Sequence, residues 1–282
     1  MIDKRYIPLD KSWIIRMGIL DMVNGYEDIN KFLSTQENLS DDLLALKRAV
    51  SVWKTNEAID VGESGTLYRL LRFASWKLGL DKKVIAQGTL KKRKVANDSE
   101  IINLSQTELL KLDNATSQWA TGAVLLGDEE RLSNPPFKLN LTYEAVDHWK
   151  KQRGKGLVWD IRYDETILRQ AETYLELLKD KKPEFILTQA EDFCFASVFG
   201  YITAEEGERR WPALREHESD RIVEIQEMLE VAKADKEITS RDHRVIQAIA
   251  MWGKVNKVAV KIKYPDAVNK SWPLFWDFIN KS

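Results

Sequence analysis

Apolar residues return every three or four positions in several stretches of the chain, which is the spacing of one face of an α-helix. The clearest stripes cover residues 43–53, 67–78 and 222–232. A fourth stripe, in "TSRDHRVIQAIAMWGK", follows Ser240 and Asp242, either of which can cap a helix. The pattern therefore predicts four amphipathic helices, the last one ending near the glycine of this segment.

Short segments rich in β-branched and aromatic residues separate the helical stretches. Such segments favour β-strands. They are "KVIAQG" at 83–88, "FKLNLTY" at 137–143, "GLVWDI" at 156–161, "EFILTQ" at 184–189 and "KVAVKIKY" at 257–264. Helices that alternate with short strands, without a long linker, predict a mixed α and β protein.

The composition is that of a globular chain without a strong charge of either sign. The 282 residues can form one large domain or two smaller ones; 44% of them are apolar, 31% are charged, and the formal net charge is -1. This balance argues against a generally nucleic-acid-binding or membrane-binding surface. Cys194 is the single cysteine, and neither a signal peptide nor a membrane-spanning run is visible, so we expect a cytoplasmic protein.

The sequence lacks the motifs of several common enzyme classes. It contains neither a Walker A pattern nor GxGxxG, and three histidines with one cysteine argue against a structural zinc site. A Ser-His-Asp hydrolase remains open, although no nucleophile-elbow pattern is present. We therefore expect neither a metal nor a cofactor.

A different feature recurs, in which a small hydroxyl residue or a glycine stands beside a cation at a helix start. Singly, each such segment is explained by a helix cap or a solvated cation, but five in one chain favour a phosphate or carboxylate cradle. In the clearest case, Arg244 would oppose the helix dipole unless an anion lay between them. The segments contribute Lys11, Ser12 and Arg16; Gly65, Thr66 and Arg69; Thr116, Ser117 and Gln118; His243 and Arg244; and Lys270 and Ser271.

Nine segments resemble, in the same order along the chain, motifs of the EPSP synthase family. They are "LDKSWIIRMGIL", "NLSDDLLALKRAV", "ESGTLYRLL", "LKKRKV", "TSQWATGAVLL", "AEDFCFASVFGYITAEEG", "HESDRIVEI", "RDHRVIQAIAM" and "NKSWPLFWDFI". The family belongs to the shikimate pathway of aromatic amino acid biosynthesis. Its members transfer the enolpyruvyl group of phosphoenolpyruvate to shikimate 3-phosphate and release phosphate, so the resemblance implies a shortened and divergent transferase of this kind.

The resemblance also implies a role for each matching residue. Lys11, Asp192 and Glu218 would be catalytic, with the two carboxylates as candidates for proton transfer. The reaction needs such groups, because the attacking hydroxyl loses a proton while the enol methylene gains one. The phosphate and carboxylate of phosphoenolpyruvate would be held by Lys11, Arg69, Arg244 and Lys270. The implied substrate-binding residues are Ser12, Arg16, Gly65, Arg69, Arg93, Thr116, Ser117, Gln118, Arg221, His243, Arg244 and Lys270.

The fold implied by the resemblance is of the α+β class. It is a two-domain inverted α/β prism of repeated βαβαββ units, with the second domain lacking about one unit. Residues 10–186 would form the domain on the shikimate-phosphate side, and residues 1–9 with 187–282 the reduced second domain. A lost unit would expose apolar surface, so we expect a homodimer or a cover formed by the tryptophan-rich C-terminus.

Several positions depart from the family pattern. Asp192 matches two family aspartates at once. The altered positions are Glu63 for asparagine, Thr89 for arginine, His217 for lysine, and Thr142, beside Tyr143, for tyrosine.

Three hypotheses therefore stand. The leading one is enolpyruvyl transfer to shikimate 3-phosphate or a similar anionic ring alcohol. The second is a non-catalytic anion-binding or assembly protein, and the third is the related transferase that acts on a nucleotide sugar. In each, the partners are small anionic molecules rather than nucleic acid or membrane.

Overall fold

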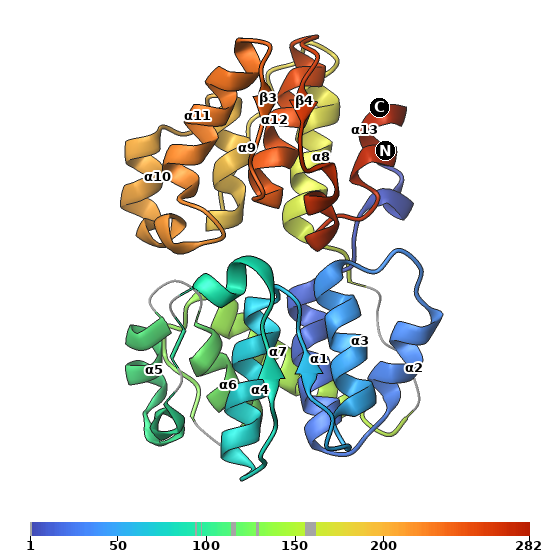
Figure 1. Cartoon of the computed structure of the whole chain (residues 1–282), viewed down its shortest axis with the longest axis vertical. Coiled ribbons are helices and arrows are strands. Elements are labelled where there is room, and N and C mark those ends of the chain that lie inside the picture. Colours follow the sequence, from blue (N-terminus) through green and yellow to red (C-terminus); the bar gives the residue numbers. More distant parts are fainter. Residues whose placement is uncertain (1, 94, 97, 114–116, 128–129, 156–161) are drawn as a thin grey trace. The chain divides into compact units, whose positions relative to one another are not determined.

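The computed structural model describes residues 2–93, 95–96, 98–113, 117–127, 130–155 and 162–282. The chain divides into two compact units, one formed by Leu9–Arg162 and the other by Met1–Pro8 with Tyr163–Ser282 (Figure 1). We call them the 9–162 unit and the 163–282 unit and describe each by itself.

The 9–162 unit is built mainly of helices. Its elements are α1 (Lys11–Val23), α2 (Asp28–Thr35), α3 (Asp41–Val52), β1 (Ile59–Asp60), α4 (Gly65–Lys77), β2 (Val84–Ile85), the 3-10 helices Gly88–Lys92 and Ser99–Asn103, α5 (Gln106–Asp113), α6 (Gln118–Leu126) and α7 (Phe137–Gln152). The two short strands pair in parallel, Ile59 with Val84 (Figure 1).

Helix α1 runs through the core of the 9–162 unit. Asp10 caps it by accepting a hydrogen bond from Trp13 N at 3.0 Å. Ten consecutive residues, from Trp13 to Met22, are buried, so the helix is covered on every side by α3, α4 and α7. Two of the ten are charged, and the buried Asp21 accepts hydrogen bonds from Ile29 N and Trp149 Nε1, which ties α1 to α2 and α7.

The 163–282 unit is also helical. Its elements are the 3-10 helix Lys4–Tyr6, α8 (Glu165–Leu177), the 3-10 helix Ala190–Asp192, α9 (Phe193–Val198), α10 (Ala204–Arg210), the 3-10 helix Pro212–Glu216, α11 (Arg221–Lys233), β3 (Glu237–Ile238), α12 (His243–Val255), β4 (Lys261–Ile262), the 3-10 helix Pro265–Lys270 and α13 (Phe275–Lys281). The N-terminal segment joins this unit because Trp272 Nε1 donates to Tyr6 O at 2.6 Å.

The boundary between the units lies at residues 162–163, earlier than the predicted boundary at residue 186. Helix α8 accounts for the difference. Ile167, Ala171 and Tyr174 have no exposed surface and lie in the same core as Phe193 and Trp272. The burial of this apolar face assigns α8 to the 163–282 unit.

The predicted prism of repeated βαβαββ units is wrong. The strands of the described residues are two residues long and form two separate two-stranded parallel sheets. The segment 137–143 is the first half of α7, and 184–189 has no regular structure. The segment 156–161 lies outside the described residues.

The four helices predicted from apolar periodicity are confirmed as α3, α4, α11 and α12. Leu139, Thr142, Ala145 and Trp149, all buried, show why the strand prediction at 137–143 failed. They are three or four residues apart over more than two turns, which is helical spacing, whereas the alternation that suggested a strand covers only a few residues. No helix in the described part of the chain is both long and apolar enough to cross a membrane.

Candidate functional site

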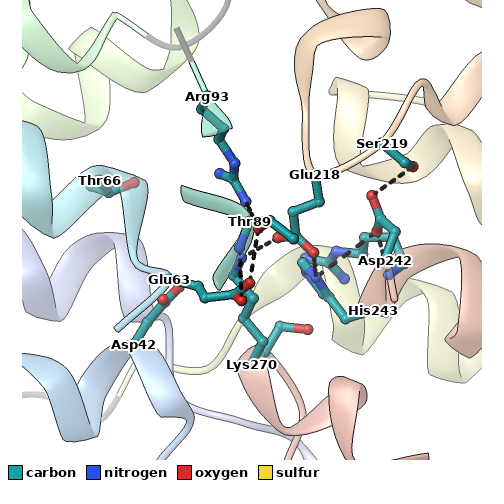
Figure 2. Close-up of polar contacts among 12 residues, drawn as sticks. Asp42, Glu63, Thr66, Thr89, Arg93, Glu218, Ser219, Asp242, His243 and Lys270 are labelled. Carbon is teal, nitrogen blue, oxygen red and sulfur yellow. Dashed lines mark hydrogen bonds and ion pairs between the residues drawn. The ribbon is translucent and has the colours of Figure 1, made fainter. Parts of the chain in front are cut away.

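The N-terminal end of α12 carries a buried ion pair. Asp242 caps the helix by accepting a hydrogen bond from Arg244 N at 2.9 Å. Its carboxylate also accepts from Arg221 Nε at 2.7 Å and Arg221 Nη2 at 3.1 Å, with a further bond from Ser219 Oγ (Figure 2). Burial raises the pKa of Asp242, but the charge and hydrogen bond of Arg221 together with the nearby His243 outweigh it, so the pKa lies below its usual value. The carboxylate is therefore ionised at neutral pH.

A second buried carboxylate lies between two cations of the same unit. Glu218 Oε2 is 2.9 Å from His243 Nδ1, and Glu218 Oε1 forms an ion pair with Lys270 Nζ (Figure 2). Burial raises the pKa of Glu218, but the positive charges of His243 and Lys270 hold the pKa well below its usual value. Since an ionised carboxylate only accepts hydrogen bonds, His243 Nδ1 carries the shared proton.

Arg244 lies beside these pairs, and two of its three guanidinium nitrogens have no partner. Its side chain is buried, with 5% of the residue exposed, and Nε and Nη1 make no hydrogen bond. A buried guanidinium loses its hydration and is costly unless an anion replaces the water. The N-terminal end of α12 therefore holds a cation that lacks a counter-charge among the described residues.

The charges of this cluster, which we call the α12 cluster, favour an anionic ligand. Arg221, Arg244 and Lys270 are three cations, against the two carboxylates Asp242 and Glu218. Arg221 and Lys270 each pair with one of these carboxylates, so Arg244 is the cation that favours an anionic ligand. Ligand atoms of Glu218, Asp242 and His243 lie within 4.8 Å of one another. A divalent metal does not fit them, because Arg221 and Lys270 already bind the carboxylates.

Several candidate residues of the 9–162 unit have partners within the same unit. Lys11 Nζ is 2.6 Å from Asp42 Oδ2. Arg69 Nη1 donates to Gln118 Oε1, and Gln118 Nε2 donates to Thr66 Oγ1 at 2.5 Å. These contacts bring the starts of α1 and α3 together, and likewise those of α4 and α6.

Two residues that depart from the family pattern bind each other in this unit. Glu63 accepts hydrogen bonds from Thr89 N at 3.0 Å and Thr89 Oγ1 at 2.9 Å, and Arg93 Nη2 donates to Thr89 Oγ1 (Figure 2). Gly65 lies beside two cations, since a Cβ there would be 3.4 Å from Arg93 Nη1 and 3.7 Å from Arg69 Nη1. Arg69 and Arg93, both predicted to bind substrate, therefore approach the same turn.

Three predicted site residues lie elsewhere. Arg16 is buried in α1 and donates to Thr142 Oγ1, Ser12 O and Lys138 O; burial lowers its pKa to about 10. These bonds use all three nitrogens of its guanidinium within the protein. Ser117 is buried at the start of α6, in the left-handed backbone region with φ of 50°. Thr116 lies outside the described residues.

Asp192 has no exposed surface, and its carboxylate is bound by the protein. It accepts hydrogen bonds from Arg169 Nη2 at 2.6 Å, Gln170 Nε2 at 3.3 Å and Thr188 N at 2.9 Å, among others. These contacts join α8 to the segment that precedes α9. They are the contacts of a structural carboxylate, and the predicted catalytic role of Asp192 stays a prediction.

Sequence reasoning missed two residues beside the candidates. Asp113 accepts hydrogen bonds from Trp119 N at 2.7 Å and Ala120 N at 3.1 Å, and burial raises its pKa to about 6. Gln247 is buried one turn after Arg244 in α12. The sequence feature that could have identified Gln247 is its single amide among the apolar residues of "VIQAIAM". Asp113 gave no such feature, because it lies too far before α6 to be recognised as the cap of that helix.

No family model matches the chain, and no curated protein or solved structure matches it either.

Proposed function

We propose that the protein binds phosphoenolpyruvate, or a closely similar small anion, at the α12 cluster and transfers its enolpyruvyl group to an anionic ring alcohol such as shikimate 3-phosphate. The observation that carries this proposal is the buried guanidinium of Arg244, whose Nε and Nη1 have no partner. Planar guanidinium donors match the paired oxygens of phosphate and carboxylate. The proposal takes its reaction class from the motif resemblance and does not depend on a prism fold.

The α12 cluster also contains the groups that proton transfer requires. The attacking hydroxyl must lose a proton and the enol methylene must gain one. Glu218 is a weak base because its pKa is held so low, and its role is to orient His243. His243 and Lys270 are the proton carriers beside it. We assign proton transfer to His243, with Glu218 as its positioning residue.

A second candidate function is anion binding without chemistry. It is favoured by the 9–162 unit, where the Lys11 ammonium faces Asp42 and the Arg69 guanidinium donates to Gln118. A substrate phosphate would have to compete with these protein partners. In this function the α12 cluster still binds its anion, and phosphate release is absent. We place either activity in the cytoplasm, where the buried thiol of Cys194 would stay reduced.

The two functions separate in one assay on the full chain. Phosphoenolpyruvate and shikimate 3-phosphate are mixed with the protein, and phosphate release is followed together with calorimetric binding of each compound. Release supports the transferase, and binding without release supports the second function. For the transferase, His243→Gln should lower the release rate by about 10²-fold or more while phosphoenolpyruvate still binds. The control is His148→Gln, which alters a histidine stacked edge-on against Trp13 in the 9–162 unit.

Absence of binding for both compounds would contradict both functions. Release that is unchanged in His243→Gln would contradict the assignment of proton transfer to His243, although not the transferase itself.

A further inference from the structure

Gln247 presents an unused hydrogen-bond acceptor inside the 163–282 unit. It is 3% exposed, and its Nε2 donates to Ser271 Oγ at 3.0 Å. Its other amide atom, Oε1, is buried and makes no hydrogen bond. A buried acceptor without a partner is costly, because it has lost its water and gained nothing in exchange.

The unused acceptor lies on the same side of α12 as the unpaired cation. Arg244 and Gln247 are three residues apart in α12, and side chains at that spacing are neighbours on a helix surface. Arg244 offers N–H donors and a positive charge, whereas Gln247 offers a neutral oxygen that accepts a hydrogen bond. A ligand that satisfies both residues has an oxyanion and, a short distance away, a hydrogen-bond donor.

Gln247 is a polar residue in an otherwise apolar stretch of α12. Its neighbours along the helix, Ile246 and Ala248, are buried apolar residues, as are Val245 and Ile249. Leucine at this position would remove the unpaired Oε1, and it would also remove the donor to the buried Ser271 hydroxyl. The hydrogen bond from Gln247 Nε2 to Ser271 Oγ fixes the orientation of the amide and therefore the direction of Oε1.

We propose that Gln247 selects, at the α12 cluster, small phosphorylated carboxylates that carry a hydroxyl group over those that do not. The inference rests on the proposed anion binding at Arg244, which both candidate functions share. It favours the second of them, anion binding without chemistry, because phosphoenolpyruvate has no hydroxyl group for Gln247 to bind. Gln247 Oε1 accepts the ligand hydroxyl proton while Arg244 binds an oxyanion. A second oxyanion at Gln247 is disfavoured, because oxygen lone pairs would face each other there.

A matched pair of probes tests this selection. 2-Phosphoglycerate and phosphoenolpyruvate both carry a phosphate and a carboxylate, but only 2-phosphoglycerate carries a hydroxyl. Calorimetry on the full chain should show 2-phosphoglycerate binding about threefold to tenfold more tightly, the range of one neutral hydrogen bond. Gln247→Leu should abolish this preference and leave the phosphoenolpyruvate affinity within about twofold. Gln247→Glu should weaken both probes and retain the preference, because the acceptor remains.

The control variant is Gln226→Leu in α11. Gln226 Nε2 donates to Ser197 Oγ at 2.7 Å, the same type of pair, but on the exposed surface. It should leave the ratio of the two affinities unchanged. A general loss of stability, checked by thermal melting, would alter both affinities together and not their ratio.

The remaining outcomes overturn the inference in distinguishable ways. Equal affinities in the unaltered protein would remove the role of Gln247 and leave the anion site standing. Tighter binding of phosphoenolpyruvate would show that Ser271 donates to Oε1 and that Nε2 faces the ligand, the reverse of the selection proposed. Absence of binding for both probes would overturn the anion site and the selection together.

Discussion

Replacing Arg221 with methionine would leave the buried carboxylate of Asp242 without its cation. The Arg221 and Asp242 side chains are 4% and 0% exposed, and two hydrogen bonds of 2.7 and 3.1 Å join them. Removing one member of a buried pair costs about 3–5 kcal/mol, since the other charge stays desolvated. For a unit of this size the loss corresponds to roughly 10–20 °C in melting temperature. Arg221→Met should therefore be strongly destabilised at pH 7.

The loss of stability in this variant should also depend on pH, and this dependence identifies the charge of Asp242 as the cause. In the unaltered protein the folded-state pKa of Asp242 is lowered, so its stabilisation is present above the unfolded value of 3.8 and is lost as the pH falls through the folded pKa. Without Arg221, burial is the main influence left and raises the pKa of Asp242. Protonation of Asp242 by acid then stabilises the variant instead of destabilising it. The stability of the variant should therefore approach that of the unaltered protein as the pH falls.

The assay is urea unfolding of the full chain, followed by circular dichroism at several pH values between 4 and 8. Arg215→Met is the control, because Arg215 binds Glu208 and Asp220 on the surface and should leave the midpoint nearly unchanged. A difference between Arg221→Met and the unaltered protein that stayed constant from pH 8 to pH 4 would refute the reasoning.

Three further predictions concern other buried carboxylates. Asp113→Asn should be more stable than the unaltered protein above pH 6, by about 3 kcal/mol, and equal to it below pH 3.8. The reason is that a pKa raised to about 6 destabilises the folded state only once the carboxyl ionises. Equal urea midpoints at pH 8 would contradict this. The folded-state pKa of Glu218 is lowered from its ordinary value of 4.5, so the stability that its ionised carboxylate contributes is lost in acid, below pH 4.5. Glu218→Gln should remove this part of the loss of stability in acid. An unchanged acid unfolding curve would count against this prediction. Asp192→Asn should lower stability by about 2 kcal/mol, since it removes the charge that Arg169 binds, while calorimetry shows phosphoenolpyruvate affinity unchanged; a large loss of affinity in a stably folded variant would restore a direct role for Asp192.

The helices of this protein could be predicted from the sequence much better than its strands. Helices α3, α4, α11 and α12 each repeat their apolar residues over three turns or more, and a repeat of that length is typical of a helix and exceeds the length of most strands. In the segment 137–143 apolar and polar residues alternate over only a few positions. The segment is helical because it begins the longer helix α7, whose residues Leu139 and Trp149 are both buried. A resemblance in motif order could not supply the missing strands, because the motifs fall mainly on helix starts.

The α12 cluster was predictable in part. The capping role of Asp242 and the unmet charge of Arg244 follow from helix electrostatics. The pairing of Glu218 with His243 and Lys270 was not visible, because each comes from a different element and only the fold brings them together. Local patterns locate single charges, whereas the partner of a buried charge depends on packing.

The most direct test of the account is calorimetric titration of the full chain with phosphoenolpyruvate, compared with Arg244→Ala. The matched control is Arg241→Ala, whose exposed guanidinium lies over the Tyr264 ring. The account predicts saturable binding that Arg244→Ala weakens by about tenfold or more, as expected for a lost charged hydrogen bond, and that Arg241→Ala leaves unchanged. Equal affinities in Arg244→Ala and the unaltered protein, or no binding to either, would contradict an anion site at the start of α12.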